Sequence, residues 1–153
     1  MVAPPRLCFV ALIVIGVTTA RVEPGAASHL AEYPQKHRIL YQLDDGGVDK
    51  AKFVLGNIRN HLNGVGWQNI EAVELVVFGP ALKSFVVKTM DADVRHLLES
   101  LQTQGLVFGA CGNTMRNFRI SLPELPDGSK PLPQGGVVRI MELQDAGYRY
   151  IRP

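Results

Sequence analysis

Cysteine is nearly absent from this 153-residue sequence, which holds only Cys8 and Cys111. Cys8 lies in a segment typical of a cleaved export signal, so the mature chain is expected to keep one thiol. One thiol cannot form an internal disulfide. Cys111 is therefore buried and inert, linked to another chain, or kept for chemistry, and the residues alone leave these alternatives open.

The sequence also lacks a large excess of positive or negative charge. The formal net charge is +2 and the basic residues are scattered, so the sequence carries no basic patch for nucleic acid or acidic membrane. Neither a Walker pattern nor G-x-G-x-x-G is present, which leaves nucleotide binding without support. The four histidines show no metal-ligand spacing among themselves or with Cys111, so we expect neither a metal nor another cofactor.

Two classes of thiol enzyme are disfavoured for the same reason. A cysteine hydrolase needs a histidine beside the nucleophile, and none is predicted near the strand ends. A thioredoxin-like oxidoreductase needs a second cysteine to resolve its mixed disulfide.

The first residues predict export. Arg6 is the only early charge, an apolar run covers Leu7 to Val17, and small residues follow at 18–20. This pattern predicts a signal peptide over residues 1–20, with cleavage as late as residue 27 as an alternative. The run is too short to span a bilayer. We therefore expect a periplasmic or secreted protein with no stable membrane span after cleavage.

The rest of the chain is predicted to hold one domain. Residues 21–36 are polar and small, which is typical of a flexible leader. Residues 37–153 have the length of a single domain, and the chain's apolar fraction of 46% is enough for a packed core.

Apolar patterning predicts alternating strands and helices within that domain. The expected strands are Ile39–Leu43, Val73–Phe78, Leu106–Ala110 and Tyr148–Ile151. The expected helices cover residues 51–62, the segment capped by Asp91 that ends before Gly105, residues 112–119 and residues 137–144. A long irregular connection is expected over residues 123–133 because it is rich in proline. Strands alternating with helices predict an α/β fold with a mainly parallel sheet.

Three loops that follow predicted strands carry unusual residues. They are Asp44-Asp45-Gly46-Gly47, the segment from Gly79 to Lys83, and Cys111-Gly112-Asn113-Thr114. Sites in open α/β sheets gather at the carboxyl ends of the strands, so these loops are expected to meet. The candidate reacting group is Cys111; the candidate substrate-binding residues are Gly112, Asn113, Thr114, Gly79, Pro80 and Lys83; Asp44, Asp45 and Gly46 are candidate pocket residues.

The position of Cys111 favours a reactive thiol. It follows a strand and precedes a helix, where unpaired N–H groups and the helix dipole lower a thiol pKa. Lys83 and Arg116 are candidates for positive charge beside it. The opposing interpretation is a small buried hydrophobic residue, since free cysteine is among the most buried residue types. For Asp44 and Asp45, making the turn and capping the next helix is favoured over acid–base or cation chemistry.

Four segments together resemble a known family. They are residues 76–82 (VVFGPAL), 106–115 (LVFGACGNTM), 135–140 (GGVVRI) and 143–153 (LQDAGYRYIRP). In this order they resemble the DsrE/DsrF-like family, in its group of small YchN-like proteins. The resemblance implies a three-layer α/β fold with helices flanking the sheet, assembly as trimers or hexamers, and a cysteine near a pocket bordered by subunits.

The resemblance also implies a role for the thiol. In better-understood relatives a cysteine accepts sulfur as a persulfide and passes it on, and by position that cysteine is Cys111. Two features depart from the pattern: Phe78 stands where many relatives carry histidine, and the leader places this chain away from tRNA thiolation. The hypothesis is an exported sulfur carrier or sulfane-sulfur relay, sulfurtransferase-like if reactive, whose partners are small sulfur species or a protein thiol. The alternative is a non-catalytic oligomeric ligand-binding or scaffold protein with a structural cysteine.

Overall fold

The computed structural model describes Met1 and residues 35–153. The predicted signal peptide, and nearly all of the predicted leader, lie outside the described residues. The described chain forms one sheet of five strands in the order β4-β3-β2-β1-β5, and every neighbouring pair is parallel. The strands are β1 (His37–Leu43), β2 (Ile70–Val77), β3 (Leu106–Cys111), β4 (Lys130–Leu132) and β5 (Arg149–Ile151).

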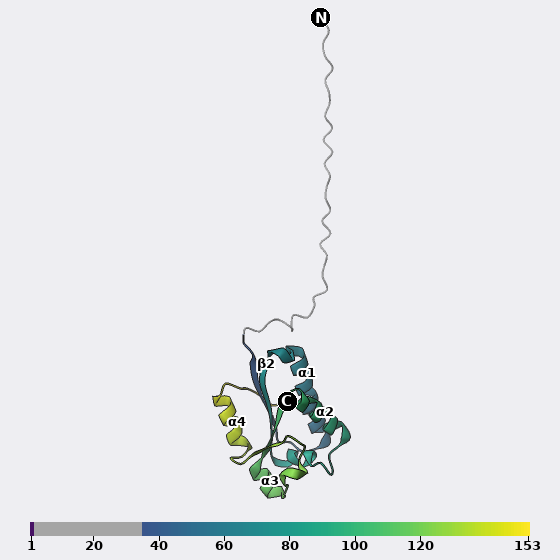
Figure 1. Ribbon diagram of the computed structural model, residues 1–153, viewed down its shortest axis with the longest axis vertical. Helices are drawn as coiled ribbons and strands as arrows, with labels where there is room; N and C mark the ends of the chain where they lie inside the picture. Colours follow the sequence, from purple (N-terminus) through teal and green to yellow (C-terminus); the bar gives the residue numbers. More distant parts are fainter. Residues whose placement is uncertain (2–34) are drawn as a thin grey trace.

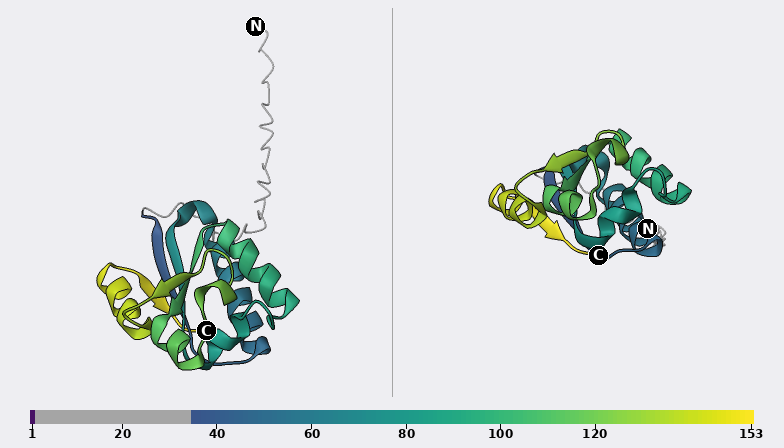
Figure 2. Two further views of the ribbon diagram at one scale, coloured as in Figure 1. Left: turned by 60° about the horizontal axis from the view of Figure 1, so that its bottom comes forward. Right: turned by 90° about the horizontal axis from the view of Figure 1, so that it is seen from below.

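Helices cover both faces of the sheet. The α-helices are α1 (Val48–Val65), α2 (Ala92–Thr103), α3 (Gly112–Phe118) and α4 (Gly136–Asp145), and the 3₁₀ turns are η2 (Trp67–Asn69), η3 (Gly79–Phe85) and η4 (Leu122–Glu124). Helices α1 and α2 lie on one side of the sheet and α4 on the other, with α3 at one end (Figures 1 and 2). The predicted three-layer α/β fold is confirmed.

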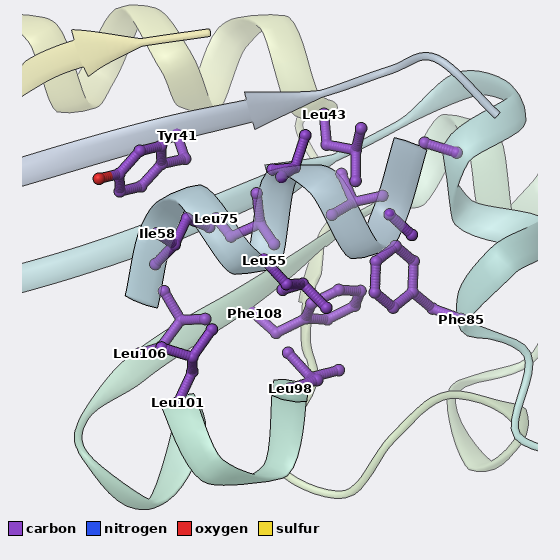
Figure 3. Packing of buried hydrophobic residues seen from close by; sticks show 14 of the residues in the cluster. Tyr41, Leu43, Leu55, Ile58, Leu75, Phe85, Leu98, Leu101, Leu106 and Phe108 are labelled. Atoms are coloured by element: carbon purple, nitrogen blue, oxygen red, sulfur yellow. The ribbon is translucent and has the colours of Figure 1, made fainter. Parts of the chain in front are cut away.

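The core is divided unequally between the two faces. The larger apolar cluster lies between the sheet and the α1–α2 pair, where the rings of Phe85 and Phe108 meet at a centroid distance of 4.9 Å (Figure 3). The smaller cluster lies under α4 and includes Leu40, Val76 and Ile140. Strand β2 is central and buried on both faces, which explains its nearly unbroken apolar run.

Glycine and aspartate set the helix ends. Asp91 caps α2 as predicted, because its carboxylate accepts hydrogen bonds from the N–H groups of Asp93 at 2.9 Å and Val94 at 3.3 Å. The expectation that Asp44 or Asp45 caps α1 is wrong: the N-cap is Gly47, and no side chain accepts a bond there. Gly66 ends α1 at φ 85°, a conformation that favours glycine.

One strand escaped the sequence prediction. β4 lies inside the segment predicted to be irregular and pairs with the end of β3, with Pro131 opposite Ala110. It has three residues and a central proline, and it lies at the sheet edge, where proline is tolerated. Trp67 packs against the larger core cluster. Among residues 35–153, every helix is too short or too polar to cross a lipid bilayer.

Candidate functional site

The three loops expected to meet do so at the carboxyl edge of the sheet. The Ala81 N–H donates to the Asp44 carbonyl oxygen at 3.3 Å, and a side chain at Gly46 would lie 3.0 Å from the Pro80 Cβ. The Gly79 N–H donates to the Thr114 hydroxyl oxygen at 2.9 Å. The loops after β1, β2 and β3 therefore form one connected surface.

Cys111 lies where β3 becomes α3. It is the last residue of the strand and the N-cap of the helix, and it is only 5% exposed. Its Sγ accepts a hydrogen bond from the Gly136 N–H at 3.2 Å. Gly136 is the first residue of α4, so the starts of two helices converge on one sulfur atom.

Neutral donors govern the ionisation of this thiol. Burial raises the pKa of Cys111. The Thr114 hydroxyl and the backbone N–H groups of Thr114, Gly136 and Asn113 lower it, and because their combined effect is larger, the pKa is below the ordinary value. The stabilised form is the thiolate, which is the nucleophilic form of cysteine.

Thr114 links two of the loops through one oxygen atom. Its hydroxyl accepts from the Gly79 N–H and also hydrogen-bonds the Cys111 sulfur. A hydroxyl has one proton, and acceptance from Gly79 leaves that proton for the sulfur. The glycine after β2 therefore orients the hydroxyl that stabilises the thiolate.

Two glycines allow the surrounding backbone to approach the sulfur. A Cβ at Gly112 would lie 2.8 Å from the Leu132 carbonyl oxygen, and a Cβ at Gly136 would lie 2.9 Å from the Phe78 Cδ1. Phe78 therefore packs against the start of α4. This is the position where many members of the resembled family carry histidine.

Sequence reasoning missed Gly136 as a donor to the thiol. It belongs to a helix that follows the irregular connection, not to one of the three loops after strands. The available signal was the Gly135-Gly136 pair directly before the apolar start of a helix. Such a pair permits close backbone approach.

A shallow groove lies along α3, and Cys111 is not among the residues that line it. Its volume is about 410 Å³, and its walls include Gly112, Met115, Arg116, Arg119 and Pro133. The Arg116 guanidinium donates to the Asn113 side-chain oxygen. The groove thus combines apolar walls with two cationic side chains next to the helix that begins at the thiol.

The remaining predicted residues lie apart from the sulfur. The Lys83 ammonium lies over the Phe118 ring, 4.2 Å from its centroid, and is not among the groups that lower the pKa of Cys111. Asp44 forms an ion pair with Arg152 at 3.0 Å, and Asp45 lies 3.6 Å from the same guanidinium. These carboxylates hold the C-terminal residues against the loop after β1.

Two histidines of the described chain take part in contacts away from the thiol. His61 Nδ1 hydrogen-bonds the Tyr41 hydroxyl, and His37 Nδ1 lies 2.8 Å from an Arg149 nitrogen. Within residues 35–153, no three His, Cys, Asp or Glu side chains gather as metal ligands would.

The fold and site define a class: a three-layer α/β protein with one donor-surrounded thiol at the carboxyl edge of a parallel sheet. No protein-family model and no curated protein matches the sequence. The fold is that of YchN from E. coli, whose structure covers 76% of this chain and 99% of its own at TM-score 0.57 and 13% identity. The DsrE/YchN-like resemblance is therefore confirmed at the level of the fold.

Two further solved structures share this fold. MTH1491 from Methanobacterium thermoautotrophicum, a protein of unknown function, has TM-score 0.65 and 24% identity over 77% of this chain and 100% of its own. BT1422 from Bacteroides thetaiotaomicron, also of unknown function, has TM-score 0.57 and 16% identity over 76% of this chain and 94% of its own. These likenesses concern the fold alone.

Proposed function

We propose that this protein carries sulfane sulfur as a persulfide on Cys111. The observation that carries the proposal is the set of four neutral donors around the Cys111 sulfur, whose net effect is a pKa below the ordinary thiol value. A purely structural cysteine has no need of a stabilised anion. The YchN-like fold supports the proposal through the family resemblance.

The chemistry needs no cofactor. The Cys111 thiolate attacks the outer sulfur of thiosulfate, a Cys111 S–S bond forms, the donor S–S bond breaks, and sulfite leaves with the electron pair. The product is Cys111–S–S⁻. A partner thiolate then attacks the terminal sulfur and takes it as its own persulfide, returning the Cys111 thiolate. In this scheme the N–H groups of Asn113 and Gly136 stabilise the Cys111 thiolate before loading.

Intact mass measures this loading directly. The domain that begins at Ser28 is treated with thiosulfate, and separately with polysulfide. Its intact mass is then measured by mass spectrometry with and without reductant. We expect a reducible gain of one sulfur atom in the wild type and none in Cys111→Ser, because serine cannot form the persulfide. A wild type that gains no sulfur from either donor contradicts the proposal.

A second candidate function rests on the burial of the same residue. With Cys111 only 5% exposed, the protein could be a non-catalytic ligand-binding or scaffold protein in which the cysteine packs. Alkylation separates the two functions. A thiol that resists iodoacetamide in the folded protein and reacts in denaturant favours the packing role, whereas reaction in the folded protein favours the carrier.

We also propose that the protein assembles as a trimer or hexamer. The support is an exposed apolar strip on α4, where Val137 is 67% and Met141 55% exposed and Val138 lies beside them. Met141→Glu is expected to reduce the mass measured by light scattering to that of a monomer, while Met141→Leu keeps it. A monomeric wild type contradicts this assembly.

Export completes the proposed role, because it would place the carrier among extracytoplasmic sulfur compounds. The support is the pattern of residues 1–20. The check is the mass of the mature N-terminus after expression of the full chain in a bacterium with a periplasm. A protein that retains residue 1 and stays in the cytoplasm contradicts export.

A further inference from the structure

A buried carboxylate lies under α4, and the proposed chemistry does not use it. Glu74 of β2 is 4% exposed and is bound by Arg139 of α4 through two hydrogen bonds, Nε to Oε1 at 2.9 Å and Nη2 to Oε2 at 2.8 Å. An ion pair replaced by well-packed apolar residues often costs a protein nothing. Stability alone therefore does not explain why a charge is placed here.

Space for this carboxylate comes from the strand that carries the thiol. A Cβ at Gly109 would lie 3.1 Å from Glu74 Oε1, so a larger residue would push the carboxylate aside by a few tenths of an ångström. Gly109 precedes Cys111 by two residues on β3, and residues two apart on a strand share a face. The ion pair and the thiol are thus on the face of the sheet that α4 covers.

Arg139 connects the Glu74 carboxylate to Gly136, the residue whose N–H donates to the thiol sulfur. Arg139 follows Gly136 by three residues, so the two lie in neighbouring turns on one side of α4. The Arg139 N–H donates to the Gly135 carbonyl oxygen at 3.1 Å, and this hydrogen bond closes the first turn of the helix. A two-point guanidinium–carboxylate contact fixes both the distance and the orientation of the groups that it joins. It therefore restrains the first turn of α4 against β2.

That turn is also tied to the end of β4, because the Gly135 N–H donates to the Leu132 carbonyl oxygen at 3.0 Å, but its side chains add little. Gly135 and Gly136 have no side chains, and Val137 and Val138, which follow them, are exposed. The apolar cluster under α4 draws on Ile140 and Leu143, which lie further along the helix. The Phe78 ring contacts Gly136 without a directional bond.

We propose that Glu74 and Arg139 form a positioning pair, which holds the first turn of α4 so that the Gly136 N–H stays on the Cys111 sulfur. The pair acts on the same thiol as the proposed function. Its readout is the ionisation of that thiol, which is measured without a sulfur donor, so a protein that fails to load sulfur leaves this inference standing.

The experiment measures the iodoacetamide alkylation rate of Cys111 against pH in the wild type and in Glu74→Gln. A hydrogen bond to a charged group is worth roughly one to two pKa units. Loss of the Gly136 bond should therefore raise the kinetic pKa of Cys111 by about one unit and slow alkylation at neutral pH about tenfold. Arg139→Lys keeps the charge but not the two-point contact, and should raise the pKa by a smaller amount.

Glu71→Gln is the matched control. Glu71 lies on the same strand and pairs with Arg38 at 2.6 Å. Arg38 donates to the Ala146 carbonyl at the C-terminal end of α4, so the same change breaks an arginine pair far from the first turn of α4 and should leave the pKa unchanged.

Glu74→Gln removes the buried charge that faces Arg139, which then keeps, within the described chain, only the Glu142 carboxylate at 3.5 Å. Because this change can impair folding, the double variant Glu74→Leu/Arg139→Met is measured as well. A wild-type pKa in folded Glu74→Gln, or in the folded double variant, overturns the proposal.

Discussion

Replacing Thr114 with valine is expected to raise the pKa of the Cys111 thiol by about one to two units and to destabilise the fold. Valine keeps the shape of threonine and removes the hydroxyl that hydrogen-bonds the sulfur, and such a bond to a charged group is worth roughly 1.5–3 kcal/mol. The Gly79 N–H also loses its acceptor, which costs about 1–3 kcal/mol of unfolding free energy. Alkylation kinetics and urea denaturation measure the two effects.

Two variants isolate the hydroxyl as the cause. Thr114→Ser keeps it and should stay close to the wild-type thiol pKa. Thr103→Val removes an exposed hydroxyl that bonds the Glu99 carbonyl within α2, and should leave the thiol unchanged. If Thr114→Val alkylates with the wild-type pH profile, the hydroxyl does not stabilise the thiolate.

The lowered thiol pKa also predicts how stability depends on pH. Between the pKa of the folded thiol and the ordinary value of about 8.5, the unfolded chain binds more protons than the folded one, so stability rises with pH in that window. The thiolate contribution is complete above the ordinary pKa and is lost as the pH falls through the folded pKa. The difference in unfolding free energy between the wild type and Thr114→Val should therefore widen as the pH rises through the window. A constant difference contradicts this.

Gly112→Ala is the second change with a large expected effect. The added Cβ would lie 2.8 Å from the Leu132 carbonyl oxygen, and a backbone atom cannot move aside as a flexible side chain can. The contact between α3 and β4 must open, which is expected to cost about 1–3 kcal/mol of unfolding free energy. Thermal and urea denaturation measure the loss, and alkylation at neutral pH should change with it because Gly112 adjoins the thiol.

Gly64→Ala provides the matched control. Gly64 lies inside α1, and a Cβ there meets nothing within 4 Å. The same substitution should therefore stabilise the protein by about 0.5–1 kcal/mol, since alanine loses less backbone entropy than glycine in a helix. If Gly112→Ala is as well tolerated as Gly64→Ala, the space at Gly112 is not limiting.

Local patterns in the sequence predicted most of the fold. Burial can be predicted from the apolar run of β2 and from the spacing of Val94, Leu98 and Leu101 on α2, because buried positions in strands and helices are occupied by apolar residues at a regular period. β4 was missed because three residues around Pro131 carry no period that could be read. Pairing with β3 forms this strand, and that pairing is a tertiary effect.

The site was predictable in part for the same reason. Cys111 and Thr114 lie together in the sequence, and the order of strands and helices brought Gly79 to them. Gly136 and Glu74 were missed because their relation to the thiol depends on how α4 lies across the sheet. The ion pair of Asp44 with Arg152 was missed likewise, since the partner lies 108 residues away.

One donor to the sulfur, the Gly136 N–H, comes from a helix 25 residues away in the sequence. Any local opening that lifts α4 from the sheet would uncover Cys111 and remove the Gly136 N–H in one event. The uncovered sulfur would lose that donor together with the burial that raises its pKa, and it would keep the donors of Thr114 and Asn113. The position of α4 on the sheet therefore sets both the exposure of Cys111 and one of its hydrogen bonds, so a motion of this helix changes the two together.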